Sequence, residues 1–260
     1  MDYPEDFINK IICGDCLEVM KDIPNGSIDL TITSPPYDNL RDYKGYVFDF
    51  ENIAKELYRV VKHGGVVVWI IGDATVRGSE TGTSFRQALH FKDIGFNLHD
   101  TMIWNKGGFS AIGSLAVRYA PVFEYMFVFA KGKIKTFNPI KDRKTKYGGK
   151  EVGGTIRNSN GSMKPMSKRM IINEYSQRFN VWEMSPQRQS GKDKHPAPFP
   201  EKLANDHIIS WSNEGDLIFD PMCGSGTTCK MALLNKRNFI GIDCSEEYCE
   251  ISRKRIYQND

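Results

Sequence analysis

Apolar and β-branched residues recur along this chain in short runs, a pattern that is typical of the buried strands of an α/β protein. The run at 121–131 is longer than the others, and we expect it to form a hairpin with the run before it. Together the runs predict strands at 11–12, 28–33, 66–72, 98–104, 121–131, 217–219 and 239–242.

Helical spacing separates several of these runs. The clearest helix is predicted at 50–62, where Ile53, Leu57 and Val60 fall on one face. The glycine pair that follows His63 predicts the end of this helix. Further helices are predicted at 84–94, 199–211, 228–236 and 245–257, the last with Ser245 as its N-cap. Strands that alternate with helices predict a doubly wound α/β sheet with helices on both faces.

The strand predicted at 28–33 leads into Thr33-Ser34-Pro35-Pro36-Tyr37. Proline removes a ladder donor and restrains the residue before it, so the chain must leave the sheet in a stiff, extended loop. Such a loop can hold an aromatic ring and several oxygen atoms at a strand's carboxyl end, where open α/β sheets bind ligands. A purely structural turn is the alternative, since proline and serine are ordinary loop residues.

A second loop, Asp220-Pro221-Met222-Cys223-Gly224-Ser225-Gly226-Thr227-Thr228, lies between a predicted strand and a predicted helix. In this arrangement the backbone can approach a ligand closely, and the N–H groups of the helix point at it. The next predicted strand ends at Asp243, where a carboxylate is placed to bind ribose hydroxyls. Neither the dinucleotide pattern G-x-G-x-x-G nor a P-loop is present. The loop therefore predicts a nucleoside-binding unit, with a tight structural turn as the alternative.

Charge is distributed unevenly. The 260 residues carry a formal net charge of only +3, but segment 131–194 holds sixteen Lys or Arg against five Asp or Glu. Interleaved aromatic residues are Phe137, Tyr147, Tyr175, Phe179 and Trp182. This mixture suits contacts with phosphates and bases, although a solvated basic surface is the alternative.

Further sequence features narrow the class of protein. No run of about eighteen apolar residues is present, and the first ten residues lack an apolar signal core, so we expect a cytoplasmic protein. Six cysteines in a chain of this length do not form a disulfide scaffold. Cys13 and Cys16 form a lone C-x-x-C, which favours buried thiols over a zinc site, and we predict no metal.

Taken with both loops, the chain resembles the β-class DNA amino-methyltransferases, which methylate exocyclic nitrogens of cytosine or adenine with S-adenosylmethionine. Residues 33–37 match the family's catalytic motif and residues 220–228 its cofactor motif, in the order of the permuted β class. Weaker matches are Gly14-Asp15-Cys16 and His195-Pro196-Ala197-Pro198-Phe199-Pro200. Met222 departs from the usual phenylalanine, so an apolar contact to the cofactor could remain but an aromatic stack could not.

The resemblance implies a Rossmann-like, doubly wound mixed sheet of the circularly permuted methyltransferase fold. It places a catalytic half at 1–130, a basic target-recognition insert at 131–194, and a cofactor-binding half at 195–260. It also implies duplex DNA as the substrate. A cognate restriction endonuclease and a homodimer are compatible with it, and the sequence leaves the oligomeric state open.

For catalysis, the resemblance assigns the motif Ser34, Pro35, Pro36 and Tyr37. Hydrogen-bond acceptors on the amino group would favour a pyramidal, nucleophilic nitrogen and stabilise the charge that develops as the methyl arrives. The Ser34 hydroxyl and the Pro35 carbonyl resemble the family's acceptors, and Tyr37 would stack on the base. A base inside a duplex cannot reach such a pocket, so base flipping is implied.

For the cofactor, the resemblance implies that Asp220 binds the methionine amino group and Asp243 the ribose. Gly224 and Gly226 let the backbone pass close, and Thr227 and Thr228 cap the helix or touch the carboxylate. The remaining candidates are Asp15 and Cys16 at the adenine edge, Phe199 at the methionine end, and Thr33, Pro221 and Met222 from the two motifs. Asp15 could instead be a helix cap, and Phe199 could be simple core.

The target base depends on Ser34. The family's adenine enzymes mostly carry Asp at this position, and serine can both accept from the amino group and interact with the neighbouring ring nitrogen, so cytosine N4 is favoured over adenine N6. An RNA or protein methyltransferase could share the cofactor loop, but the basic insert argues for DNA. A non-catalytic nucleic-acid-binding protein could keep the same fold, but the intact motifs argue against it.

Overall fold

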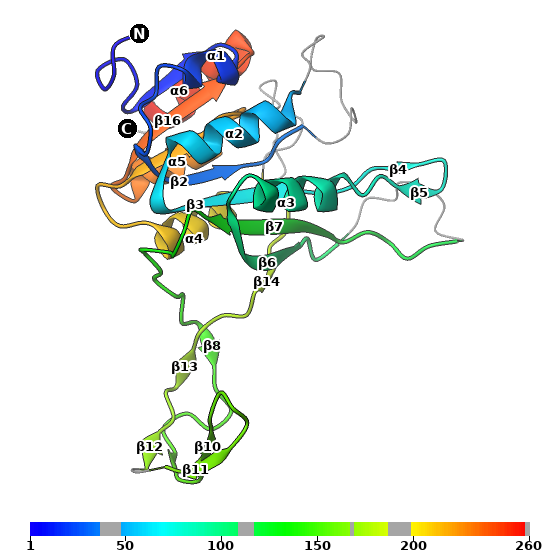
Figure 1. Ribbon diagram of the computed structural model, residues 1–260, viewed down its shortest axis with the longest axis vertical. Coiled ribbons are helices and arrows are strands. Elements are labelled where there is room, and N and C mark those ends of the chain that lie inside the picture. Colours follow the sequence, from blue (N-terminus) through cyan, green and yellow to red (C-terminus); the bar gives the residue numbers. More distant parts are fainter. Residues whose placement is uncertain (37–47, 109–116, 167–168, 187–198, 258–260) are drawn as a thin grey trace. The chain divides into compact units, whose positions relative to one another are not determined.

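The computed structural model describes every residue except 37–47, 109–116, 167–168, 187–198 and 258–260 (Figure 1). It consists of two compact units. The larger one joins Met1–Asn138 to Asn180–Asp260, and the smaller one is Pro139–Phe179. The smaller unit falls inside the segment predicted as the basic insert.

The larger unit is built on an eight-stranded sheet in the order β1-β16-β15-β2-β3-β7-β6-β14 (Figure 1). In that order the strands are Lys10–Cys13, Asn238–Asp243, Leu217–Asp220, Ile28–Thr33, Val61–Ile71, Phe123–Ala130, Asn97–Asn105 and Val181–Glu183. Strand β7 runs antiparallel to both β3 and β6, and the other neighbouring strands are parallel. The predicted mixed sheet and the predicted pairing of 121–131 with the strand before it are confirmed.

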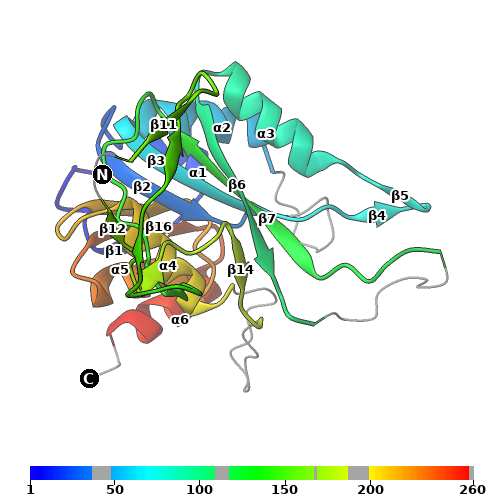
Figure 2. The ribbon, with the colours of Figure 1, turned by 90° about the horizontal axis from the view of Figure 1, so that it is seen from below.

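Helices cover both faces of this sheet (Figure 2). Their bounds are α1 Cys16–Met20, α2 Phe50–Val60, α3 Thr83–Asp93, α4 Glu201–Trp211, α5 Thr227–Leu234 and α6 Glu246–Tyr257. Alternation along β3 divides the core: Val66, Val68 and Ile70 pack with α4, α5 and α6, whereas Val67, Trp69 and Ile71 pack with α1, α2 and α3. The doubly wound Rossmann-like class is therefore confirmed.

The boundary between α2 and β3 differs from the sequence prediction. The glycines after His63 do not end the helix, because α2 stops at Val60 and β3 begins at Val61. Gly64 has a φ of +87°, and its N–H donates to the Lys131 carbonyl at 2.6 Å. A Cβ on Gly65 would lie 2.9 Å from the Asp29 carbonyl oxygen. The two glycines thus let strands approach closely rather than terminate a helix.

Four further elements of the larger unit were not predicted. Helix α1 is only five residues long, too short for a periodic pattern. Strand β14 lies within the predicted basic insert but belongs to the main sheet, beside β6. Strands β4 Thr75–Val76 and β5 Ser79–Glu80 form a small hairpin after β3.

The smaller unit consists of three short antiparallel ladders. They pair β8 Arg143–Lys144 with β13 Tyr175–Ser176, β9 Glu151–Val152 with β12 Met170–Ile171, and β10 Thr155–Arg157 with β11 Met163–Pro165. None of its described residues is buried. Hydrogen bonds and ring contacts, rather than an apolar core, therefore hold its described part together. Across all described residues, no helix is long and apolar enough to cross a membrane.

Candidate active site

Parallel strands bring both sequence motifs to one edge of the sheet. Strands β1, β16, β15 and β2 are neighbours and all parallel, so their carboxyl ends lie together. These ends carry Asp15, Asp243, Asp220 and Ser34, respectively, at or just after the last strand residue. The fold therefore places the predicted catalytic and cofactor residues along one edge, as expected for a ligand site in an open α/β sheet.

The glycine-rich loop that follows β15 is fixed by backbone contacts. The Cys223 N–H donates to the Ile242 carbonyl, and the Gly226 N–H donates to the Cys223 carbonyl, each at 2.8 Å. Gly226 caps helix α5 with a φ of +77°, and a Cβ on it would lie 2.0 Å from the Ser252 hydroxyl oxygen. A side chain at Gly226 would therefore be strained and would also collide with helix α6.

Asp220 carries the one carboxyl group in the sequence of this loop. Its side chain is buried at the end of β15, and burial raises its pKa to about 6. The hydroxyls of Thr33 and Thr228 and the N–H of Met222 act in the opposite direction, and the charge of Asp243 raises the pKa further. The Met222 N–H donates to Asp220 Oδ1 at 3.2 Å. A buried carboxylate with this cost of ionisation is suited to receive a cationic group.

Asp243 holds the loop from the neighbouring strand β16. Its Oδ2 accepts from the Gly224 N–H at 2.8 Å, and its Oδ1 accepts from the Ser245 N–H at 2.9 Å. Burial raises the pKa of this carboxyl group, and the two N–H donors lower it. Each carboxylate oxygen can accept a second hydrogen bond, so binding of ribose hydroxyls is compatible with this positioning role.

Asp15 and Cys16 stand at the end of β1. The Asp15 carboxylate accepts from the Leu17 N–H at 2.8 Å and caps helix α1, the alternative role considered from the sequence. Cys16, the first residue of that helix, is buried. The Gly14 N–H donates to the Asp243 carbonyl at 2.9 Å, which joins the end of β1 to the end of β16. Contact of Asp15 and Cys16 with adenine stays a prediction. Among the described residues, no cluster of His, Cys, Asp and Glu could hold a metal ion.

The catalytic motif begins where β2 ends. Thr33 and Pro35 are buried, and Ser34 and Pro36 are half-buried. The Thr228 hydroxyl donates to the Ile32 carbonyl at 3.3 Å, so the first turn of α5 is joined to the end of β2. Tyr37 lies outside the described residues.

The remaining cofactor candidates lie around this loop. Pro221, Gly224 and Thr227 are buried, and Met222 is half-buried against the core that contains α1, α2 and α3. Phe199 is only 8 % exposed and belongs to the core beside α4, as its alternative interpretation expected. Residues 195–198 lie outside the described part of the chain. One residue not considered from the sequence also reaches the loop: Arg255 of α6 donates to Ser225. The sequence contains no signal for this contact, because a basic residue in the last turn of a helix does not indicate which distant residue it will contact.

Comparison with known proteins decides the family. A family model of DNA methylases, covering N6 and N4 methyltransferases, matches residues 28–254. The chain belongs to this DNA methylase family. The resemblance to β-class DNA amino-methyltransferases is thereby confirmed.

This DNA methylase has well-matched relatives. It is 54 % identical over 243 residues to the orphan methyltransferase M.BamHII of Bacillus amyloliquefaciens, with 91 % of each chain covered. It is 30 % identical over 262 residues to the Type II methyltransferase M.HpaI of Haemophilus parainfluenzae, covering 95 % of this chain and 74 % of that one.

Solved structures share the fold of the methylase. The PvuII DNA methyltransferase, described as cytosine-N4-specific, matches with a TM-score of 0.73 at 22 % identity, covering 96 % of this chain and 86 % of that one. M1.HpyAVI in complex with S-adenosylmethionine matches with a TM-score of 0.65 at 22 % identity, covering 95 % of this chain and 98 % of that one.

Proposed function

We propose that this DNA methylase transfers a methyl group from S-adenosylmethionine to the exocyclic N4 of a flipped-out cytosine in duplex DNA. One observation carries the proposal: Ser34 follows β2 directly, and the neighbouring parallel strand β15 ends in the loop of Asp220. The contact between Thr228 and Ile32 joins the two loops. A base held at Ser34 and a methyl donor held at Asp220 would therefore meet at one edge of the sheet.

S-adenosylmethionine is the cofactor, and it supplies an electrophilic methyl group on a sulfonium centre. The residues of the loop fit its polar ends. The buried Asp220 carboxylate would pair with the amino group, because a cation there offsets the cost of ionising the carboxyl group. The N–H groups in the first turn of α5, which have no acceptor within the helix, would face the carboxylate. Asp243 would accept from the ribose hydroxyls.

On the acceptor side, the exocyclic amino nitrogen would accept the methyl group that the bound cofactor supplies. The nitrogen then carries a positive charge until it releases a proton. The Ser34 hydroxyl and the Pro35 carbonyl would accept hydrogen bonds from the amino group and stabilise that charge. Alignment of the two reactants supplies much of the remaining rate enhancement.

Ser34 and the fold likeness to a cytosine-N4-specific enzyme both support cytosine as the target. Adenine N6 is the second candidate, because the matched family includes N6 enzymes. The test is to methylate unmodified duplex DNA with labelled cofactor, digest it to nucleosides, and identify the product by mass spectrometry. We expect N4-methylcytosine. N6-methyladenine would overturn the choice of base alone, and the absence of any methylated nucleoside would overturn the proposed activity.

We also propose that the smaller unit binds the DNA duplex. Pro139–Phe179 holds ten Lys or Arg against three Asp or Glu. Its aromatic side chains are exposed: Tyr147 by 51 %, Tyr175 by 50 % and Phe179 by 62 %. Cations lie near two of these rings, with Arg143 4.1 Å from the centre of Phe179 and Lys150 5.4 Å from that of Tyr147. Basic groups and exposed rings together suit phosphates and unstacked bases.

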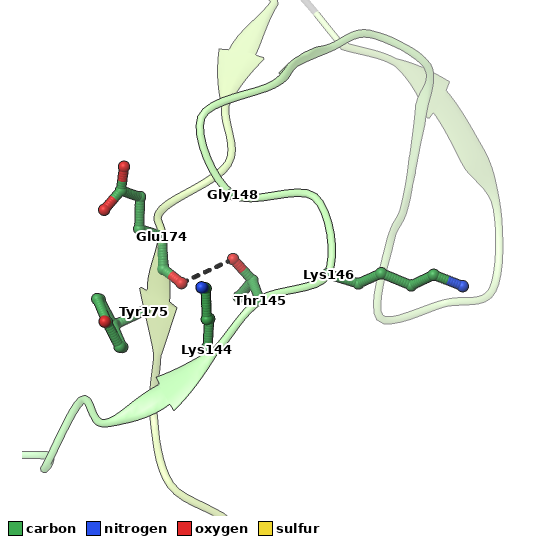
Figure 3. A pocket seen from close by; sticks show the side chains of 6 residues that line it. All are labelled: Lys144, Thr145, Lys146, Gly148, Glu174 and Tyr175. Carbon is green, nitrogen blue, oxygen red and sulfur yellow. Dashed lines mark hydrogen bonds between the residues drawn. The ribbon is translucent and has the colours of Figure 1, made fainter.

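Lys144, Lys146 and Lys150 of this unit are exposed, and Figure 3 shows Lys146 extending away from the other labelled side chains of its pocket. We expect the triple change K144Q, K146Q and K150Q to raise the KM for DNA at least about tenfold at moderate salt. The slope of log affinity against log salt should fall by up to about 3, since each lost phosphate contact removes about 0.9. The control replaces the exposed Lys10, Lys55 and Lys92 of the larger unit with Gln. Equal salt slopes for the two triple variants would contradict a DNA-binding role of this unit.

A cognate restriction endonuclease is a further partner that we propose. M.HpaI is named a Type II methyltransferase, whereas M.BamHII is named an orphan. If such a partner exists, DNA modified by this methylase resists cleavage by it, which digestion of modified and unmodified DNA measures directly.

A further inference from the structure

Ser225 lies between the two glycines of the cofactor loop and is only 2 % exposed. Its carbonyl oxygen and its hydroxyl oxygen both accept from Nη1 of Arg255, at 2.7 and 2.6 Å. The same nitrogen lies 3.4 Å from the Thr227 hydroxyl oxygen. One guanidinium therefore contacts the loop on both sides of Gly226, next to the first turn of α5.

Arg255 is itself fixed by a network of three helices. Its Nη2 donates to Oε1 of Glu201, the first residue of α4, at 2.9 Å. Lys230 of α5 donates to the same oxygen at 2.9 Å. Burial acts to raise the pKa of Glu201, but the bonds from Lys230 and Arg255 outweigh it and lower the pKa. The side chains of Glu201, Lys230 and Arg255 are 31, 19 and 20 % exposed, so solvent screens this network only in part.

A second residue of α6 supports the loop one turn earlier. Ser252 is fully buried, and its hydroxyl oxygen occupies the place where a Cβ of Gly226 would have to lie. Helix α6 thus contacts the loop through Ser252 and Arg255, which are three positions apart and share a face. On its other side the loop is held by the Ile242 carbonyl and by Asp243. The loop is therefore clamped between strand β16 and helix α6.

We propose that Arg255 is a positioning residue for S-adenosylmethionine. It fixes the backbone of Gly224, Ser225 and Gly226 and the start of α5, which are the parts that would contact the ligand. The inference rests on the proposed assignment of residues 220–228 as the cofactor site. Because Arg255 acts on the site before the ligand arrives, its loss weakens cofactor binding and leaves the transfer step at saturating cofactor nearly unchanged.

The test is the change Arg255→Gln, with Lys254→Gln as the matched control. Lys254 lies on the same helix, carries the same charge and is exposed. We expect Arg255→Gln to raise both the Kd, measured by calorimetry, and the KM for S-adenosylmethionine by about tenfold or more, the range for a lost charged hydrogen bond. The kcat at saturating cofactor and the KM for DNA should stay within about twofold of the parent protein. The control should match the parent in all four quantities.

A double-mutant cycle with Ser225→Ala distinguishes an effect of Arg255 on the loop from a nonspecific loss of protein stability. If Arg255 acts through Ser225, the two changes together raise the Kd by less than the product of their separate effects. Arg255→Lys keeps the charge and one donor, so it should restore part of the affinity. If Arg255→Gln does not fold, Arg255→Lys and Ser225→Ala each decide the question by the same rise in Kd and KM for the cofactor.

Two results would overturn the proposal. One is cofactor binding by Arg255→Gln within about twofold of the parent, and the other is an equal loss in kcat, DNA binding and cofactor binding. A parallel measurement on Asp220→Asn distinguishes this failure from a failure of the site assignment. If Asp220→Asn loses the cofactor and Arg255→Gln does not, only the positioning role is wrong. If both variants bind like the parent, the assignment of the loop is wrong.

Discussion

Asp220→Asn is expected to weaken S-adenosylmethionine binding by about a hundredfold or more and, at the same time, to raise the Tm of the ligand-free protein. Removing one partner of a buried, hydrogen-bonded charge pair costs about 2–5 kcal/mol of binding free energy. The ligand-free protein, in contrast, must bury an ionised carboxylate with no cation bound. Asparagine has nearly the same shape and no charge, so it removes that cost.

The raised pKa of Asp220 determines how the increase in the Tm of Asp220→Asn depends on pH. Its pKa is about 6 in the fold and 3.8 without the fold. The stabilisation from the neutral carboxyl group is fully present below pH 3.8 and is lost as the pH rises through 6. A shift of about two pKa units means that the ionised carboxylate lowers the free energy of unfolding by at most about 3 kcal/mol at neutral pH. The Tm advantage of Asp220→Asn should therefore be largest above about pH 7 and shrink towards about pH 4.

Thermal unfolding and calorimetry across this pH range test the prediction. Glu5→Gln, an exposed carboxyl group in the N-terminal segment, is the control for the loss of one negative charge. Cofactor binding by the parent should also weaken below about pH 6, as Asp220 becomes protonated in the free protein. A lower Tm for Asp220→Asn than for the parent at about pH 7.5 would contradict the idea that the ionised Asp220 carboxylate destabilises the ligand-free protein.

Ser34→Ala is expected to lower kcat by about a hundredfold or more, the usual cost of removing one group that stabilises developing charge. Alanine removes the hydroxyl that would accept from the amino group, but it leaves the two prolines and the path of the loop unchanged. The Kd for S-adenosylmethionine should stay within about twofold of the parent, because we propose that the cofactor binds at the loop of Asp220 and not at Ser34. Single-turnover methylation of duplex DNA measures the effect on the transfer step directly.

Ser79→Ala, at an exposed serine of the β4–β5 hairpin, is the control for this change. A transfer rate of Ser34→Ala within about twofold of the parent would show that the hydroxyl has no part in catalysis. A loss of cofactor affinity as large as the loss of rate would instead indicate that the change disturbs the whole edge of the sheet.

The sequence predicted the strands and loops that form the candidate site, because each of them is determined by residues close together in the chain. A double proline must end strand β2, and a glycine-rich turn followed by helical residues must leave β15 abruptly. The carboxyl ends of parallel neighbours coincide, so Ser34, Asp220 and Asp243 come to one edge of the sheet. Periodicity also separated the strands from most of the helices, with small shifts at their ends.

What the sequence could not predict depends on contacts between distant segments. Gly64 and Gly65 suggest a helix end locally, but the approach of Lys131 and Asp29 draws them into β3. Strand β14 lies within a basic segment, and its pairing with β6 becomes evident only in three dimensions. Arg255 reaches Ser225 from a helix thirty residues along the chain, and no local pattern marks that contact.

None of the described residues of Pro139–Phe179 is buried, so packing places little constraint on its side chains. The residues that flank this unit are held within the larger one: the Asn138 N–H donates to the Ser210 carbonyl, and the Asn180 side chain donates to Asp100. Folding free energy comes mainly from buried apolar surface, and here that surface lies in the larger unit. Substitutions in the segment between these two asparagines therefore cost little stability. The segment can therefore change in sequence, and with it the contacts that we propose it makes with DNA, while the fold of the larger unit is kept.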